Sequence, residues 1–214
     1  MLLHFDTVTP LLKEILEVLV SNPLFNPFRL VGGTNLSLRY GHRMSDDIDL
    51  FTDAEYKSLD YGLFEKFLES NFSYYYNSDD TSIVSFGRGY LVGNSPKEYV
   101  KIDLMYADPF INDAEVIDGV RLASVEDIIA MKMNVVLRGG RKKDFWDLHH
   151  LMNDYSVTQM LELHEKRHPW EHDEKILRKQ MVDFSTADEL PDPHCLLNKD
   201  WDYIKLDIID AVSK

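Results

Sequence analysis

Apolar residues recur along the chain with two spacings, and the spacing predicts which element each segment forms. A repeat of three and four residues begins after Thr9 and Pro10, an N-cap residue and a proline suited to the first helical position, and predicts a helix over residues 10–21. The same repeat predicts further helices over residues 53–71, 124–138, 143 onward, 156–166, 172–183 and 201–212.

Runs rich in β-branched and aromatic residues predict strands. They cover residues 28–31, 47–51, 72–76, 83–86 and 99–106, and Asp118-Gly119 predicts a short hairpin over residues 115–120. The aromatic residues of 72–76 are expected to pack within the sheet rather than to stack on bases. Residues 185–198, with their two prolines, predict a loop.

These elements predict an α/β fold of the α+β kind. We expect a mixed β-sheet, mostly antiparallel after residue 72, flanked by helices and followed by a C-terminal helical lobe. Residues 1–122 would form the α/β core and residues 123–214 the helical lobe packed on it.

The segment from Phe28 to Thr34 ends an apolar run in two glycines and a threonine. Glycine alone readily adopts positive φ values and lets a backbone approach closely, so Gly32 and Gly33 predict a tight turn. Residues 34–40 then predict a short helix, whose first amides and dipole favour an anion. We therefore expect Gly32, Gly33 and Thr34 to bind phosphate.

Two carboxylates follow on the next predicted strand. Asp47 and Asp49 stand at positions i and i+2, so both project from one face. Like charges side by side are unfavourable unless a cation lies between them, and hard oxygen ligands suit magnesium. On the later strand, Lys101 and Asp103 share one face. Asp103 alone would suit a solvent-facing edge, but beside the first pair it is the expected third carboxylate.

These motifs resemble a known superfamily. A Gly-Gly turn, a spacer of residues 34–46 and Asp-Ile-Asp on a strand resemble the polymerase-β-type nucleotidyltransferases. The finer pattern, Gly-Gly-Thr-x-Leu with a later His-Arg-x-Ser-x-Asp-Ile-Asp-Leu-Phe, resembles the AbiEii/AbiGii toxin branch. A second block is similar to the downstream motif of that branch: Lys132-x5-Arg138, then Arg141-x-Lys143-Asp144-x-x-Asp147-Leu148.

The resemblance, which covers residues 25–150, implies a nucleotidyltransferase that moves a nucleoside monophosphate from a nucleoside triphosphate (NTP) to an acceptor hydroxyl. It implies that Asp47, Asp49 and Asp103 hold two magnesium ions, or manganese in their place, and that Asp103 is the general base. It also implies a toxin-like enzyme with a tRNA 3′ end as acceptor and an antitoxin as partner.

The basic residues of both blocks are the expected partners of the triphosphate, which needs cations on the side away from the metals. They are Lys132, Arg138 and Lys143, with Arg43 directed to phosphate or acceptor. The alternative for them is a solvated charge run, or a snorkelling side chain for Lys132. Ser45 would orient Asp47 or shape the turn. Asp144 and Asp147 would be catalytic acids or, in the interpretation we favour, would hold lysine and arginine side chains in place.

Composition and charge limit the kinds of partner and the cellular location that we expect for this protein. The net charge is −14, which argues against a protein that coats nucleic acid through a general basic surface, and residues 138–143 are the densest positive run. A single cysteine, no signal peptide and no membrane span predict a cytoplasmic protein. Two alternatives to RNA modification stay open: transfer to a small molecule or a protein hydroxyl, and a non-enzymatic binding protein with this fold.

Overall fold

The computed structural model describes residues 2–77 and 86–214. Its helices are η1 Phe5–Thr7, α1 Pro10–Ser21, η2 Pro23–Phe25, α2 Gly32–Tyr40, α3 Tyr61–Asn71, α4 Val125–Leu137, α5 Lys142–Leu151, α6 Val157–Arg167, α7 Glu174–Met181, α8 Ser185–Asp188 and α9 Trp201–Val212. Its strands are β1 Arg29–Leu30, β2 Asp47–Thr52, β3 Tyr74–Asn77, β4 Gly87–Ser95, β5 Glu98–Tyr106, β6 Glu115–Ile117 and β7 Val120–Leu122. Within these described ranges, no helix is long and apolar enough to cross a membrane.

The described strands form one seven-stranded sheet in the order β3-β4-β5-β2-β1-β7-β6. Strand β2 runs parallel to β5, and β1 runs parallel to β7. The remaining neighbours, including the β3-β4-β5 meander, are antiparallel. The expected mixed sheet is therefore confirmed, with a parallel pair at the position of the acidic residues.

Helices α1 and α3 cover one face of this sheet. Ile48 of β2 and Ile102 and Leu104 of β5 are fully buried in the core that these helices complete. Because successive side chains of a strand point to opposite faces, Asp47 and Asp49 project from the other side. The alternation read from the sequence is confirmed, and it places the acids on the face away from α1 and α3.

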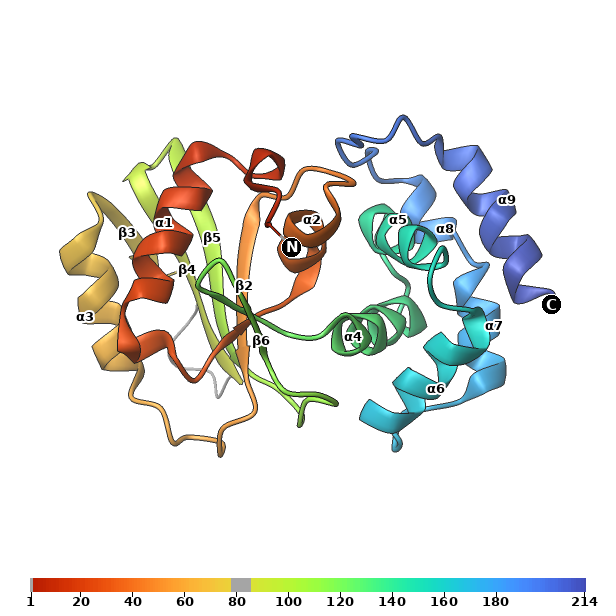
Figure 1. Ribbon diagram of the computed structural model, residues 1–214, viewed down its shortest axis with the longest axis horizontal. Coiled ribbons are helices and arrows are strands. Elements are labelled where there is room, and N and C mark those ends of the chain that lie inside the picture. The colour runs from red at the N-terminus through yellow and green to blue at the C-terminus, as the bar shows by residue number, and fades with distance from the viewer. Residues whose placement is uncertain (1, 78–85) are drawn as a thin grey trace.

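A second apolar core joins α2 to the C-terminal helices. Figure 1 shows α4–α9 gathered to the right of the sheet, with α2 between the two halves. This core includes Val31 and Leu36 as well as Trp146 and Trp201, whose rings stack with centroids 6.1 Å apart. The domain boundary after residue 122 stays a prediction, but Val31 and Leu36 place part of the first segment inside the second core.

Three elements differ from the sequence expectations. Strand β4 was not predicted, because its three glycines and its asparagine have little β propensity. Helix α3 begins later than expected: Asp60 caps it, while Thr52 is the last residue of β2. The short helix α8 interrupts the expected loop of 185–198. The strand predicted at 83–86 falls on residues of which 83–85 lie outside the described part of the chain.

Candidate active site

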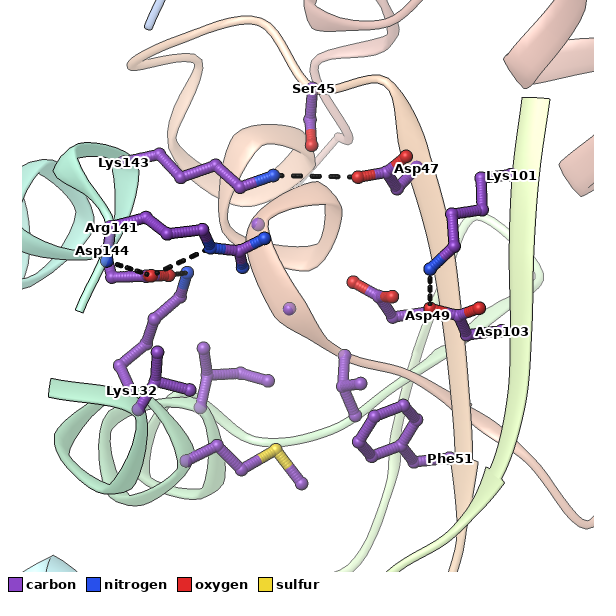
Figure 2. A pocket seen from close by; sticks show the side chains of 16 residues that line it. Ser45, Asp47, Asp49, Phe51, Lys101, Asp103, Lys132, Arg141, Lys143 and Asp144 are labelled. Carbon is purple, nitrogen blue, oxygen red and sulfur yellow. Dashed lines mark hydrogen bonds and ion pairs between the residues drawn. The ribbon is translucent and has the colours of Figure 1, made fainter. Parts of the chain in front are cut away.

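A pocket of about 220 Å³ opens at the N-terminus of α2, between the acidic face of the sheet and helices α4 and α5. Figure 2 shows its two ends. Acidic and basic side chains from β2, β5, α4 and α5 gather at one end, and Phe51 lies at the other, which is apolar. The apolar end is completed by Val31, Ile128, Met131 and Val135.

The acids come from the two parallel strands at the centre of the sheet. In the register of β2 and β5, Asp49 lies beside Asp103, and Asp47 lies beside Lys101. All three carboxylates therefore share one face. Burial, followed by the negative charges of Asp103 and Asp47, raises the pKa of Asp49 from its ordinary value of 3.8 to about 6. The site thus concentrates negative charge that a cation would relieve.

Two lysines meet these acids. The ammonium group of Lys101 contacts the Asp103 carboxylate, and the Nζ atom of Lys143 lies 3.6 Å from Oδ2 of Asp47 (Figure 2). Lys101 was not among the expected nucleotide-binding residues, although its alternation with Asp103 already placed both on one face. Cations from opposite walls of the pocket therefore flank the carboxylates.

Ionisation of Asp49 is expected to cost stability. The pKa of Asp49 is higher in the folded than in the unfolded chain, so the protonated carboxyl group stabilises the folded chain. This stabilisation is fully present below the pKa of the unfolded chain and is lost as the pH rises through about 6. We expect the wild type to lose about 2 kcal/mol of unfolding free energy relative to Asp49→Asn between about pH 4 and about pH 7. Urea unfolding of both proteins in EDTA measures this difference, and a pH-independent difference would contradict it.

Gly32 and Gly33 form the first turn of α2 and line the pocket. Gly32 has a φ of 69°, and a Cβ atom added there would lie 2.3 Å from Oδ2 of Asp49. A Cβ atom on Gly33 would lie 2.2 Å from Nη2 of Arg43. The expected tight turn is thus the start of the helix itself, and the absence of side chains lets a carboxylate and a guanidinium approach the backbone.

The closeness of Asp49 makes Gly32→Ala costly. Gly119 offers a matched control, because its φ is 81° but an added Cβ atom would have nothing within 4 Å. We expect Gly119→Ala to lose about 1 kcal/mol of unfolding free energy through backbone strain alone. Gly32→Ala should lose about 3 kcal/mol, since it adds a steric clash. Equal losses in urea unfolding would show that Asp49 does not press on Gly32.

The Thr34 hydroxyl has a structural partner. It donates to the carbonyl oxygen of Asp47, and it lies 2.8 Å from the Ser45 hydroxyl, which donates to it. Thr34 is 1% exposed and is not among the residues that line the pocket, whereas Ser45 is. Thr34 therefore ties α2 to the first residue of β2 and so fixes Asp47 relative to the two glycines.

A buried network of charges lies behind the pocket. The Asp147 carboxylate is 2.6 and 2.7 Å from the Arg43 guanidinium and 2.8 Å from Nε2 of His42. The Nζ atom of Lys132 lies 2.6 Å from Asp144 and 2.8 Å from Asp147. Burial alone would raise the pKa of Asp147 and lower that of Lys132. The opposite charges outweigh it, so the pKa of Asp147 lies well below its ordinary value and that of Lys132 above.

A backbone bridge joins residues 194–196 to the loop that contains His42 and Arg43. The amide of Met44 donates to the carbonyl of His194 at 2.9 Å, and the amide of Leu196 donates to the carbonyl of His42 at 3.0 Å. Arg43 thereby pairs with Cys195 in antiparallel fashion. The loop that leads into β2 is therefore held from two sides, by the side chain of Asp147 and by residues 194–196.

Comparison with known proteins identifies the family of this chain. A family model described as the nucleotidyl transferase AbiEii toxin of type IV toxin–antitoxin systems matches residues 14–214. The chain belongs to the AbiEii nucleotidyltransferase toxin family. An uncharacterized protein of Aquifex aeolicus (strain VF5) is 33% identical in an alignment of 183 residues that covers 83% of this chain and 83% of that protein.

Solved structures agree with the AbiEii assignment at the level of the fold. JHP933 from Helicobacter pylori superposes with a TM-score of 0.59 at 22% identity, over 94% of this chain and 88% of that one. MenT4, a nucleotidyltransferase toxin from Mycobacterium tuberculosis, superposes with a TM-score of 0.56 at 11% identity, over 88% of this chain and 76% of that one. The expected family resemblance and fold class are therefore confirmed.

The AbiEii-like pattern of side chains divides into residues that reach the pocket and residues that do not. Asp47, Asp49, Asp103, Gly32, Gly33, Ser45, Lys132, Lys143 and Asp144 line it. Arg43 does not line the pocket, because its guanidinium forms an ion pair with the Asp147 carboxylate. Arg138 does not, because the helix ends at Leu137 and the side chain turns outward, 2.6 Å from Glu171 and 64% exposed. Arg141 lines the pocket in its place.

The acids of this AbiEii-family pocket fit magnesium by their donor chemistry. They offer only oxygen atoms, from adjacent positions of two strands, and burial of Asp49 beside two like charges favours a bound cation. Among the described residues, no three acidic, histidine or cysteine side chains already converge to hold an ion. Asp103 and Asp47 instead contact Lys101 and Lys143, so metal binding requires these side chains to exchange partners.

Proposed function

We propose that this pocket transfers a nucleoside monophosphate from an NTP to an acceptor hydroxyl, with Asp47, Asp49 and Asp103 holding magnesium. One observation carries the proposal. Three carboxylates share a sheet face beside the N-terminus of α2, and the lysines of α4 and α5 stand across the pocket from them. An acidic group for metal, an anion-binding helix start and facing cations are what phosphoryl transfer requires.

The position of each residue in the pocket suggests its role in the proposed reaction. Lys132, Arg141 and Lys143, together with the amides that open α2 at Gly32, would bind the β- and γ-phosphates. Magnesium, when bound, would neutralise phosphate charge and lower the pKa of the acceptor hydroxyl. Asp103, on the neighbouring strand, would accept the proton of that hydroxyl as it attacks the α-phosphorus and pyrophosphate leaves.

Other side chains would hold this arrangement in place. Asp144 and Asp147, which both form ion pairs with Lys132, would position that lysine rather than contact the substrate. Thr34 and Ser45 fix the start of β2. A triphosphate would displace Lys143 from Asp47, since the same ammonium cannot neutralise both fully.

The proposal also includes an acceptor for the nucleotide and a partner protein. We infer a cytoplasmic reaction on the 3′ end of a tRNA, and an antitoxin partner, because the matching family is described as the toxin of type IV toxin–antitoxin systems and because MenT4 is a nucleotidyltransferase toxin. Arg141, Lys142 and Lys143 also line a groove beside the pocket, where the Nζ atom of Lys142 lies 2.8 Å from Oδ1 of Asp192.

The test is to incubate the protein with magnesium and each α-labelled NTP, alone and with total tRNA. An Asp47→Asn, Asp49→Asn double variant serves as the blank. Label in tRNA only with the intact acids would establish RNA modification and name the nucleotide. Label in a small-molecule fraction or in the protein itself would replace the acceptor but keep the chemistry. No label and no magnesium-dependent NTP binding would overturn the enzyme assignment.

A further inference from the structure

The sheet face that carries the acids continues beyond them across β5, β4 and β3. In the observed register, Tyr76 lies beside Leu91, and Leu91 lies beside Lys101. Lys101 in turn lies beside Asp47. Directly paired residues point to the same face, so one row of side chains runs from Tyr76 to Asp47. With strands about 4.8 Å apart, this row is roughly 14 Å long.

A second row, parallel to the first, is aromatic at both ends. Tyr74 and Tyr99 both pair with Gly93, and their rings approach each other across this glycine with centroids 6.2 Å apart. Tyr76 is 55% exposed and Tyr99 is 46% exposed. Tyr74, Tyr76 and Tyr99 therefore form a tyrosine platform on the sheet face that leads to the carboxylates.

The neighbouring aromatic residues behave differently. Tyr75 and Tyr90 point to the other face, where their rings lie 5.9 Å apart against the core completed by α1 and α3. The expectation that residues 72–76 pack within the sheet fits Tyr75, which packs against the core, and Tyr74, whose ring packs on Tyr99, whereas Tyr76 is 55% exposed. The tyrosines of the platform belong to neither apolar core of the described residues.

We propose that the tyrosine platform stacks on the bases of a single-stranded RNA 3′ end and brings its terminal hydroxyl to Asp103. This proposal rests on the proposed function, whose acceptor it places. Exposed rings stack on any base, and a strongly acidic protein gains more from base stacking than from phosphate contacts over a wide surface. Lys101, whose side chain is 47% exposed between the platform and the acids, supplies a cation for a phosphate.

The route from the platform to the acid is short. Gly89 pairs with Asp103, so β4 contributes no side chain beside this carboxylate. A strand stacked on Tyr76 and Tyr99 therefore reaches Asp103 along the sheet, while the NTP enters from the side of α2, α4 and α5. A duplex end would have to unpair to use the same surface, so a single-stranded end fits better.

The test measures binding without NTP. A fluorescent single-stranded ribo-oligonucleotide and a blunt duplex of the same sequence are titrated with the protein, and anisotropy gives each Kd. The variants are Tyr76→Ala, Tyr99→Ala; Tyr76→Phe, Tyr99→Phe; and the control Tyr203→Ala, a 71% exposed tyrosine on α9. We expect the double alanine variant to weaken single-strand binding roughly 100-fold, since each stacked base contributes about tenfold or more.

The other expected results are specific to stacking. The phenylalanine variant should keep Kd within about threefold, because it keeps the rings, and Tyr203→Ala should leave it unchanged. NTP binding by the double alanine variant should match the wild type. Binding that survives loss of both rings, or a blunt duplex bound as tightly as the single strand, would overturn the proposal.

Failure of the platform and failure of the proposed function give different results. Tyrosine-dependent RNA binding with no transfer from any NTP would keep the platform and reject the enzyme. Transfer to a small molecule, with no RNA binding, would keep the enzyme and reject the platform. Labelling of a protein that depends on Tyr76 and Tyr99 would assign the platform to a protein acceptor and reject the RNA assignment.

Discussion

The Asp49→Asn variant is expected to lose about 10³-fold or more of its nucleotidyl-transfer rate while remaining folded. Asp49 lies at the centre of the acidic group, close to Gly32 at the start of α2 and beside Asp103. Asparagine keeps the shape but removes the negative charge that would hold a metal ion. Single-turnover assays with labelled NTP at saturating magnesium measure the loss.

The neighbouring acid Asp46 provides the control. It is exposed and does not line the pocket, although it stands directly before Asp47 in the sequence. Asp46→Asn should therefore keep its rate within about threefold, the change expected of an exposed charge outside the pocket. Similar rates for Asp46→Asn and Asp49→Asn would mean that the acids act only through the general field of the protein.

The Asp147→Ala variant is expected to lose about 3–5 kcal/mol of unfolding free energy, the largest stability effect foreseen for any single substitution considered. Its carboxylate is fully buried and pairs with Arg43, His42 and Lys132. Removing it leaves Arg43 buried without its charge partner, and Lys132 retains only Asp144. Urea unfolding at neutral pH gives the difference directly.

A surface pair gives the matched control for this loss. Glu174 lies 2.8 Å from Arg178 on α7 and its side chain is 57% exposed, so Glu174→Ala should cost at most about 1 kcal/mol. The pKa of Asp147 lies well below 3.8, so its contribution should be present above that pH and fade as the pH falls further. A loss for Asp147→Ala no greater than that for Glu174→Ala would show that the network is not desolvated.

Local patterns predicted the parts of the site that depend on local geometry. A period of two places Asp47 and Asp49 on one face, and the same period places Asp103 with Lys101. The glycines signalled the close approach that Gly32 makes to Asp49. Capping residues located the starts of α1, α4 and α6, where Thr9, Ser124 and Ser156 accept bonds from the first turn.

Contacts between residues far apart in the sequence determine the partners of several side chains, and the sequence pattern did not predict these partners. Arg43 was expected at phosphate or acceptor, but Asp147, 104 residues away, holds it. Arg138 follows Lys132 at a spacing that fits one helix, yet it caps the end of α4 and faces Glu171. Thr34 follows the glycines, as a phosphate-binding hydroxyl would, but its hydroxyl donates a hydrogen bond to the carbonyl oxygen of Asp47. No spacing along the chain shows which of these competing partners is nearer.

The bridge between residues 42–44 and 194–196 determines when the pocket can form during synthesis. The acids of β2 leave the ribosome early, but the loop in front of them pairs with a segment made about 150 residues later. Domains generally fold as units from the N-terminus during synthesis. Here the amino-terminal half cannot complete the loop in front of β2 by itself, so a nascent chain carries the acids before residues 194–196 can pair with that loop. The pocket can therefore be completed only after residues 194–196 have left the ribosome.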